Sequence, residues 1–435
     1  MIKADEVNPF RVSGDLDPSP RNYPPAVNLL QRRVFQLDLS QTTGPADIEN
    51  WLLDDASRIE STNAFIEAFA GRLVLAQLGV ARLSLNVGTL HPQIYGYAWN
   101  WSILDGICDE VQIGEESLSS DAYRRNPLFR AIEFGEAIRI RLDAALLESE
   151  SQLMNELTAE GYSEYMVFPL AATGKRRNAV TLATQQPGGF DEHQYETLQG
   201  LLKIFALHVQ RHIANRTTKN ISYTYLGSEA GENVVKGSIK RGSGLPIKAI
   251  IWSSDMRGFS KLAEKLTNRE MSSVLDCYFS ILAESVIHHG GDVLKFIGDG
   301  MLAVFPFSKF EDENGAANAA IAAAGAAIEK LRQLNADQNT LTDVAGWRPL
   351  QTGIALHRGE VFFGNVGSPH RLDFTVIGKA VNEASRIEGL CKETKCELLI
   401  SEPVARLADR NLRSIGDFQL RGMAEQISLF TTANQ

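Results

Sequence analysis

Cysteine is scarce in this chain of 435 residues, which has four in all. Cys108, Cys277, Cys391 and Cys396 are too few for a disulfide scaffold, and they lack the paired spacing of zinc ligands. We therefore expect reduced thiols and a cytoplasmic protein.

Long apolar runs are also missing. No segment approaches 18 uninterrupted apolar residues, so the sequence predicts no transmembrane helix. Residues 1–45 begin without the apolar core of a signal peptide and are rich in Pro, Asp and Ser. This composition predicts a flexible lead-in.

Positively charged residues are in the minority: the chain has 43 Lys and Arg against 53 Asp and Glu, which gives a net charge of −10. An acidic chain argues against nucleic-acid binding or anionic-membrane binding over a broad surface, although a local basic site stays open. Apolar residues make up 44% and charged residues 22%, which is typical of a globular protein. The length predicts two or three domains.

The first half of the chain, residues 46–215, shows mixed helical and strand patterns. Helical apolar spacing marks residues 47–78 and the segment that ends near Asn215. Alternating or continuous apolar runs predict strands at 81–87, 94–101, 164–170 and 178–184. The strand sequence YGYAWNW could line a ligand pocket or form a packed sheet face, and we favour the packed face. Residues 216–245 are polar and carry five glycines, which predicts a linker between domains.

The second half, residues 246–435, shows compact units of helix and strand. We expect helices at 268–289, 315–334 and 378–393, and strands at 247–255 and 396–401. Two hairpins are predicted, one over 292–305 around a Gly-Asp-Gly tip and one over 351–367 that turns at His357–Gly359.

Two aspartates in this half stand where a strand is expected to end. Asp255 closes the apolar run IIWSSD, and Asp299 occupies the hairpin tip. If the hairpin pairs beside the first strand, both carboxylates lie at one sheet edge and form a hard-oxygen site for Mg²⁺ or Mn²⁺ with a phosphate ligand. The alternative is a helix cap at Asp255 and a plain turn residue at Asp299.

Three further polar features accompany these acids. The turn Met-Arg-Gly-Phe-Ser after Asp255 opens a helix whose backbone amides could receive phosphate oxygens. Lys295 stands between apolar residues of a predicted strand and needs either solvent or a partner. Asn382 and Arg386 are four apart, so they share one helix face that could hold a hydroxyl and a developing phosphate charge. For Lys295 and for the face with Asn382 and Arg386, the alternative is a solvated surface.

Taken in order, these runs resemble the catalytic domain of the class III nucleotidyl cyclases, the adenylate and guanylate cyclases. The resemblance covers residues 247–430. It is carried by IIWSSDMRGFS, GGDVLKFIGDGMLAVF, GIALHRGEVFFGNVGSPHRLDFTVIGKAVNEASRIEGL and FQLRGMAEQISLF. It implies an α+β fold with a ferredoxin-like palm, and an enzyme that makes a cyclic nucleotide and pyrophosphate.

The resemblance also implies roles at the metal and phosphate positions. Asp255, Asp299 and Met256 match metal-binding positions for two Mg²⁺ or Mn²⁺ ions per site. Asn382 matches the residue that orients the ribose, and Arg386 matches the one that stabilises the transferring phosphate.

Other positions match the residues that bind the substrate. Lys295 and Thr375 match the pair that recognises the base, and a lysine with a threonine is the arrangement of one subclass of adenylate cyclases. Physically, a lysine donates to adenine N1 and a hydroxyl can accept from the exocyclic amine, although a threonine can also donate. Arg421 and Arg371 are triphosphate candidates, and Phe259 is a further substrate-binding candidate.

One chain of this family does not complete the site, because the aspartates and the remaining groups come from different protomers. The resemblance therefore implies a head-to-tail homodimer with two equivalent sites. The function that follows is an adenylate cyclase that converts ATP to 3′,5′-cyclic AMP in intracellular signalling. The alternatives are a cyclase acting on GTP or another nucleotide, and an inactive cyclase-like module.

Residues 46–215 resemble GAF-like sensory domains, with a PAS-like fold as the alternative. The resemblance implies an α/β domain that binds a small molecule or dimerises, without naming the ligand. The apolar stripe of the 192–215 helix could pair with its twin and control the catalytic dimer, or it could pack onto its own sheet.

Overall fold

The computed structural model describes residues 19–88, 94–114, 116–117, 121–142, 151–170, 178–337, 344, 349–421 and 425–433. These residues form two compact units that divide between Ile221 and Ser222. None of the helices in the described part of the chain is both long enough and apolar enough to cross a membrane.

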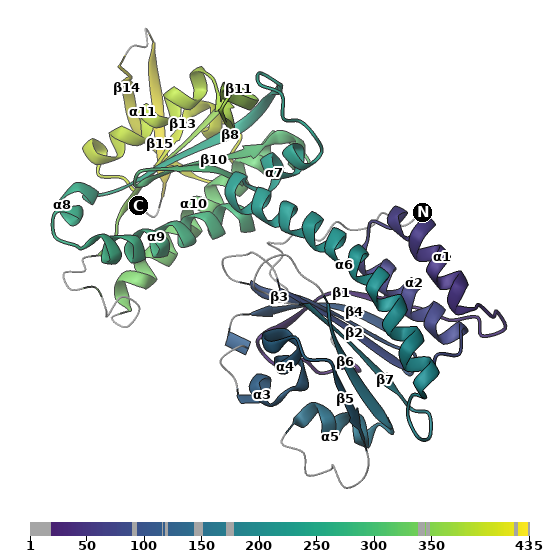
Figure 1. The fold of residues 1–435 in the computed structure, drawn as a ribbon. Helices are drawn as coiled ribbons and strands as arrows, with labels where there is room; N and C mark the ends of the chain where they lie inside the picture. Colours follow the sequence, from purple (N-terminus) through teal and green to yellow (C-terminus); the bar gives the residue numbers. More distant parts are fainter. Residues whose placement is uncertain are drawn as a thin grey trace. The chain divides into compact units, whose positions relative to one another are not determined.

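The N-terminal unit is built on an antiparallel sheet in the order β1-β4-β3-β2-β7-β6-β5 (Figure 1). Its strands are β1 (Val27–Val34), β2 (Arg82–Gly88), β3 (Ile94–Ser102), β4 (Ile107–Gly114), β5 (Ile138–Arg141), β6 (Glu164–Leu170) and β7 (Asn178–Thr184). Its helices are α1 (Pro45–Asp54), α2 (Thr62–Leu75), α3 (Asp121–Arg125), α4 (Pro127–Phe134), α5 (Gln152–Ala159) and the first part of α6 (Glu192–Leu226).

Helices cover both faces of this sheet. The α1, α2 and α6 side chains form one core with the sheet, with Phe65, Phe69 and Phe205 fully buried in it. A smaller core on the other face joins α4 and α5 to β6 and β7. This arrangement is compatible with the predicted α/β sensory domain, and the GAF-like resemblance stays a prediction.

The C-terminal unit contains an eight-stranded sheet in which β8 lies between β10 and β11. Its strands are β8 (Gly244–Met256), β9 (Asp292–Ile297), β10 (Gly300–Pro306), β11 (Thr352–Ser368), β12 (Arg371–Ile377), β13 (Leu398–Ser401), β14 (Leu412–Gln419) and β15 (Gln426–Thr432). Its helices are α7 (Ser228–Val235), α8 (Phe259–Ala263), α9 (Asn268–His288), α10 (Glu313–Ala336), α11 (Lys379–Thr394) and α12 (Glu402–Ala405).

Two layers of helix enclose this sheet as well. Helices α9 and α10 pack on one face, and α7 and α11 pack on the other. Both long helices begin at capping residues: Thr267 with Glu270 forms a capping box before α9, and Asp312 accepts the Gly315 N–H at 2.7 Å before α10. The expected α+β class is therefore confirmed for this unit.

Two sequence expectations are wrong. Residues 351–367 form no hairpin at His357–Gly359, since β11 runs straight through and keeps its register with β8. The glycine at 359 serves a close approach instead, because a Cβ there would overlap the Cβ of Ala380 on α11. The predicted linker, residues 216–245, is mostly helical: α6 continues to Leu226, stops at Gly227 (φ +85°) and is followed by α7. The division at Ile221 lies within this interval, and its role as a linker stays a prediction.

The second wrong expectation concerns the flexible lead-in. Residues 27–34 form β1, which pairs antiparallel with β4 at the edge of the sheet. Arg32 anchors the strand through an ion pair with Asp109 at 2.7 Å. Residues 1–18 of the lead-in lie outside the described residues.

Candidate active site

Asp255 and Asp299 meet at one end of the central strands. Asp255 is the next-to-last residue of β8, and Asp299 lies in the turn between β9 and β10. The register places Gly300 opposite Asp255, and the Met256 N–H donates to the Asp299 carbonyl at 3.3 Å. The structure thus brings together the two carboxylates that the sequence singled out.

The acid pair is electrostatically strained. Burial raises the pKa of Asp255, and the charge of Asp299 and a hydrogen bond with it raise that pKa further, against the opposing effect of Arg257. A divalent cation would relieve this repulsion, because it is attracted to both carboxylates at once. The residues therefore fit Mg²⁺ or Mn²⁺.

The donor set fits as well. Two carboxylates are hard oxygen ligands, and Mg²⁺ commonly takes one or two of them together with water and substrate phosphates. Among the described residues, no cluster of three or more His, Cys, Asp or Glu side chains could hold a metal by itself. The Met256 side chain is buried in the core against α9 and α10, so this residue could contribute only main-chain atoms.

An open groove adjoins the acid pair. Asp255, Asp299 and Phe259 line it, and Phe259 begins α8 after a turn at Gly258 (φ +76°). Its cationic lining residues are Arg257, Lys261, Arg332, Lys392 and Lys395. Cations around two carboxylates suit a polyphosphate that is bound together with metal ions.

Lys295 and Thr375 lie on a different part of the sheet. Lys295 is half-buried on β9 opposite Leu302, and Thr375 is on β12 opposite Gly364. Strand β12 approaches β9, so these two residues belong to neighbouring strands. The Thr375 side chain is buried at 5% exposure, and its hydroxyl has no hydrogen-bond partner among the described residues. Because buried polar atoms are normally paired, this unpartnered hydroxyl is a candidate for a ligand contact.

Helix α11 presents Asn382 and Arg386 on an exposed face. Its opposite face is anchored in the sheet: Glu383 accepts from His357 Nε2 at 3.0 Å, and His357 Nδ1 contacts the Ser401 hydroxyl at 2.9 Å. Burial lowers the pKa of His357, so the ring is neutral near pH 7 and its Nε2–H points to the carboxylate. The buried contacts thus fix how α11 presents its two exposed polar residues.

Within one chain, the predicted site residues fall into two groups. Lys295, Thr375, Asn382 and Arg386 are absent from the described lining of the groove that holds Asp255 and Asp299. Arg371 and Arg421 are both exposed, at the start of β12 and just after β14. This separation is what a site shared between two chains would require.

Comparisons with known proteins agree with this geometry. Residues 248–432 match the family described as the adenylate and guanylate cyclase catalytic domain. The chain contains a catalytic domain of this family. An adenylate cyclase of Anabaena cylindrica is 34% identical over 184 residues, which make up 42% of this chain and 34% of that protein. The terminal-differentiation specific adenylate cyclase of Dictyostelium discoideum is 31% identical over 187 residues, 41% of this chain and 8% of that protein.

Solved cyclase structures also resemble the domain. The adenylyl cyclase CyaB from P. aeruginosa is 25% identical, with a TM-score of 0.40 over 44% of this chain and 97% of that chain. The guanylyl cyclase Cya2 is 30% identical, with a TM-score of 0.36 over 43% of this chain and 92% of that chain. The match of residues 248–432 to the family confirms the predicted class III cyclase domain. It spans about a third or less of the curated relatives named above.

Sequence reasoning missed an ion pair beside the acids of the cyclase domain. Arg257 Nη2 lies 3.1 Å from Glu388 Oε1, which joins the loop after β8 to α11. Arg257 follows Asp255 by two residues, and Glu388 follows Arg386 by two. The only indication in the sequence was that Arg257 and Glu388 each carry a charge close to a matched motif. Nothing in the sequence showed that the two side chains would form an ion pair.

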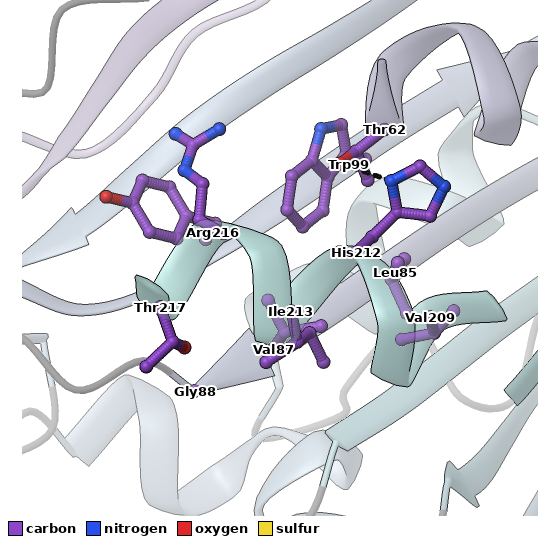
Figure 2. A pocket seen from close by; sticks show the side chains of 11 residues that line it. Thr62, Leu85, Val87, Gly88, Trp99, Val209, His212, Ile213, Arg216 and Thr217 are labelled. Atoms are coloured by element: carbon purple, nitrogen blue, oxygen red, sulfur yellow. Dashed lines mark hydrogen bonds between the residues drawn. The ribbon is translucent and has the colours of Figure 1, made fainter. Parts of the chain in front are cut away.

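The aromatic strand of the N-terminal unit lines a small pocket under α6 (Figure 2). Tyr97 and Trp99 of β3 face Val209 and Ile213 of α6 across it. Its free space holds no more than about one water molecule. The packed sheet face, rather than a ligand pocket, is therefore the interpretation that the structure favours.

Proposed function

We propose that this protein is an adenylate cyclase that converts ATP to 3′,5′-cyclic AMP and pyrophosphate. The observation that carries the proposal is the meeting of Asp255 and Asp299 beside a groove with a cationic lining. Lys295 and the unpartnered hydroxyl of Thr375 support adenine as the base, because a cation can donate to N1 and a hydroxyl can accept from the amine.

Each group has a task in the reaction. Two Mg²⁺ or Mn²⁺ ions held by Asp255 and Asp299, when bound, would neutralise phosphate charge and favour loss of the ribose 3′-hydroxyl proton. Asn382 orients the ribose so that its 3′-oxygen attacks the α-phosphorus in line. Arg386 offsets the charge that develops on the phosphate oxygens, and pyrophosphate leaves towards the cationic side chains of the groove.

The site is completed by a second copy of the chain. Asn382 and Arg386 are exposed on α11 and do not line the described groove of their own chain, which supports a homodimer with two composite sites. Mixing inactive Asp255→Ala and inactive Asn382→Ala chains should restore partial activity, because one of the two sites in the heterodimer carries neither change. No recovery after demonstrated subunit exchange would contradict the shared site.

One assay tests the substrate. Purified protein is incubated with Mn²⁺ and each of the four nucleoside triphosphates, and the products are identified by mass spectrometry. Cyclic AMP from ATP is the expected product. GTP is the second candidate, because the free hydroxyl of Thr375 can donate to guanine as readily as it accepts from adenine. No cyclic product from any nucleotide would favour an inactive module.

We further propose that the N-terminal unit regulates this activity in the cytoplasm, where the four free cysteines stay reduced. The stripe on α6 is not the means, because Leu198, Leu202, Phe205 and Val209 are buried in the core of their own domain. What supports regulation is the continuity of α6, which covers the division at Ile221. Inserting flexible residues near Thr217 should uncouple turnover from added effectors or cell extract.

A further inference from the structure

Arg257 stands at a place where it competes for the acid pair. It follows Asp255 by two residues, and its positive charge counters the raised pKa of that carboxyl. Its N–H donates to the Gln351 carbonyl at 2.8 Å, which ties the loop to the start of β11. An arginine so close to two carboxylates would be expected to pair with one of them and to repel a divalent cation.

The side chain points elsewhere. Arg257 Nη2 lies 3.1 Å from Glu388 Oε1 and donates to the Glu388 carbonyl at 3.3 Å. Both side chains are largely buried, at 22% and 11% exposure, so solvent screens the pair only weakly. The guanidinium is thereby held on the α11 side of the loop.

A glycine makes room for this contact. Gly353 of β11 lies opposite Asp255 in the sheet register. A Cβ at position 353 would overlap the Arg257 guanidinium and come within 2.7 Å of Glu388 Oε1. The pair therefore crosses the backbone of β11 directly beside the metal-site strand, where a larger residue would displace it.

Glu388 is also within the field of the acid pair. Burial raises its pKa to about 7, and Asp255 and Asp299 act in the same direction while Arg257 opposes them. The described charged groups that act on Glu388 are thus one cation and two carboxylates, all at the end of β8 or the adjoining turn. Arg257 therefore lies close to three acids, and its guanidinium is oriented towards Glu388, which is not one of the two proposed metal ligands.

We propose that Glu388 is a positioning residue that sequesters Arg257, so that Asp255 and Asp299 stay open to a divalent cation. The inference rests on the metal role assigned above to that acid pair. Glu388 contacts neither metal nor substrate, and it acts only through the arginine. When Glu388 loses its charge, Arg257 turns to Asp255 and excludes the cation.

The test is Mn²⁺ binding to the full-length protein without nucleotide at about pH 8, where Glu388 is mostly charged, measured by the electron paramagnetic resonance signal of free Mn²⁺. Glu388→Gln should weaken Mn²⁺ binding by about tenfold or more, because one neutralised acid leaves a competing cation free. Adding Arg257→Met to that variant should return the affinity to within about threefold of wild type, because the competitor is gone. Glu393→Gln is the matched control, the same chemical change at an exposed position of the same helix.

Each result decides between distinct conclusions. Wild-type affinity in folded Glu388→Gln, or a double variant as weak as the single one, overturns the sequestration of Arg257. If Glu388→Gln loses its circular dichroism spectrum, Glu388→Asp replaces it, with weaker binding expected and rescue by Arg257→Met; unchanged binding there overturns the proposal. Absence of Mn²⁺ binding in the wild type would instead overturn the metal site itself, and a wild type that binds Mn²⁺ but makes no cyclic nucleotide would overturn only the proposed activity.

Discussion

An acid in the N-terminal unit and the acid pair of the cyclase domain have opposite environments. In the N-terminal unit, Asp109 is fully buried and accepts from Arg32 at 2.7 Å and from the Tyr23 hydroxyl at 2.7 Å. In the cyclase domain, half-buried Asp255 lies beside Asp299, and burial and the charge of Asp299 raise the pKa of Asp255. The charge of Asp109 is balanced by arginine and contributes to the fold of the N-terminal unit. The charges of Asp255 and Asp299 lack such a balance, which marks the place where a cation is expected.

The difference should appear most strongly when the acid pair is broken. Asp255→Ala or Asp299→Ala should reduce cyclic AMP formation by at least about a thousandfold, equivalent to roughly 4 kcal/mol of lost transition-state stabilisation. Stability should hold or rise, because repulsion between the carboxylates disappears. Turnover and the urea midpoint are measured on the same preparations, and full turnover in either variant would remove the metal assignment.

At Asp109, by contrast, a substitution is expected to lower the stability of the N-terminal unit. Asp109→Asn leaves Arg21 and Arg32 facing an uncharged partner in a buried setting, which should cost roughly 3–5 kcal/mol of unfolding free energy in the N-terminal unit. Asp55→Asn is the control, since its pair with Arg58 is exposed and worth about 1 kcal/mol or less. Urea denaturation followed by tryptophan fluorescence measures both. If both variants lost the same unfolding free energy, burial would not determine how much these ion pairs stabilise the unit.

Base selection should respond more modestly. Lys295→Glu with Thr375→Cys should lower kcat/KM for ATP by roughly 10- to 100-fold, because a lost hydrogen bond to a buried group costs about 1–3 kcal/mol. Some activity with GTP is the expected gain, since a glutamate can accept hydrogen bonds from the N1–H and the amine of guanine. The ratio of kcat/KM for the two nucleotides measures the change, and an unaltered ATP preference would show that these residues do not read the base.

The sequence predicted the cyclase domain better than its surroundings. The Gly-Asp-Gly tip and the acid after IIWSSD placed Asp255 and Asp299 correctly, because strand ends follow from local apolar patterns. The strand through His357–Gly359 was mistaken for a turn, because Arg-Gly is a local turn signal while pairing with β8 and the approach of Ala380 are long-range. The same limit hid the Arg257–Glu388 pair.

In the N-terminal unit, the misjudged segments depended on tertiary contacts. β1 follows a Pro- and Asp-rich stretch, and its pairing with β4 joins residues far apart in the sequence. The apolar stripe of α6 was correctly recognised, but its partner was not, since a stripe does not say whether it meets its own sheet or another chain. Helix α6 continues to Leu226, beyond the end expected near Asn215, because the first glycine after Asn215 that can terminate it is Gly227.

The smallest expected effect concerns His212, a buried histidine of α6 in the N-terminal unit. His212 Nε2 lies 3.0 Å from Arg211 Nη2, and Nδ1 lies 3.2 Å from the Thr62 hydroxyl (Figure 2 draws the latter contact). Because a guanidinium only donates, Nε2 must accept and Nδ1 carries the proton of a neutral ring. Burial, followed by the charges of Arg211 and His208, lowers the pKa of His212 to about 4.

The stability that depends on this neutral ring is therefore complete above the ordinary histidine pKa of about 6.5 and is lost as the pH falls towards 4. At pH 5 the loss from His212 alone should be roughly 2 kcal/mol, since each unit of pKa shift is worth about 1.4 kcal/mol. His212→Gln removes the titration, so the difference in urea midpoint between variant and wild type should shrink from pH 7 to pH 5. A difference independent of pH would show that His212 protonates without penalty in the folded domain, and the acid sensitivity of the unit would then lie with its carboxylates.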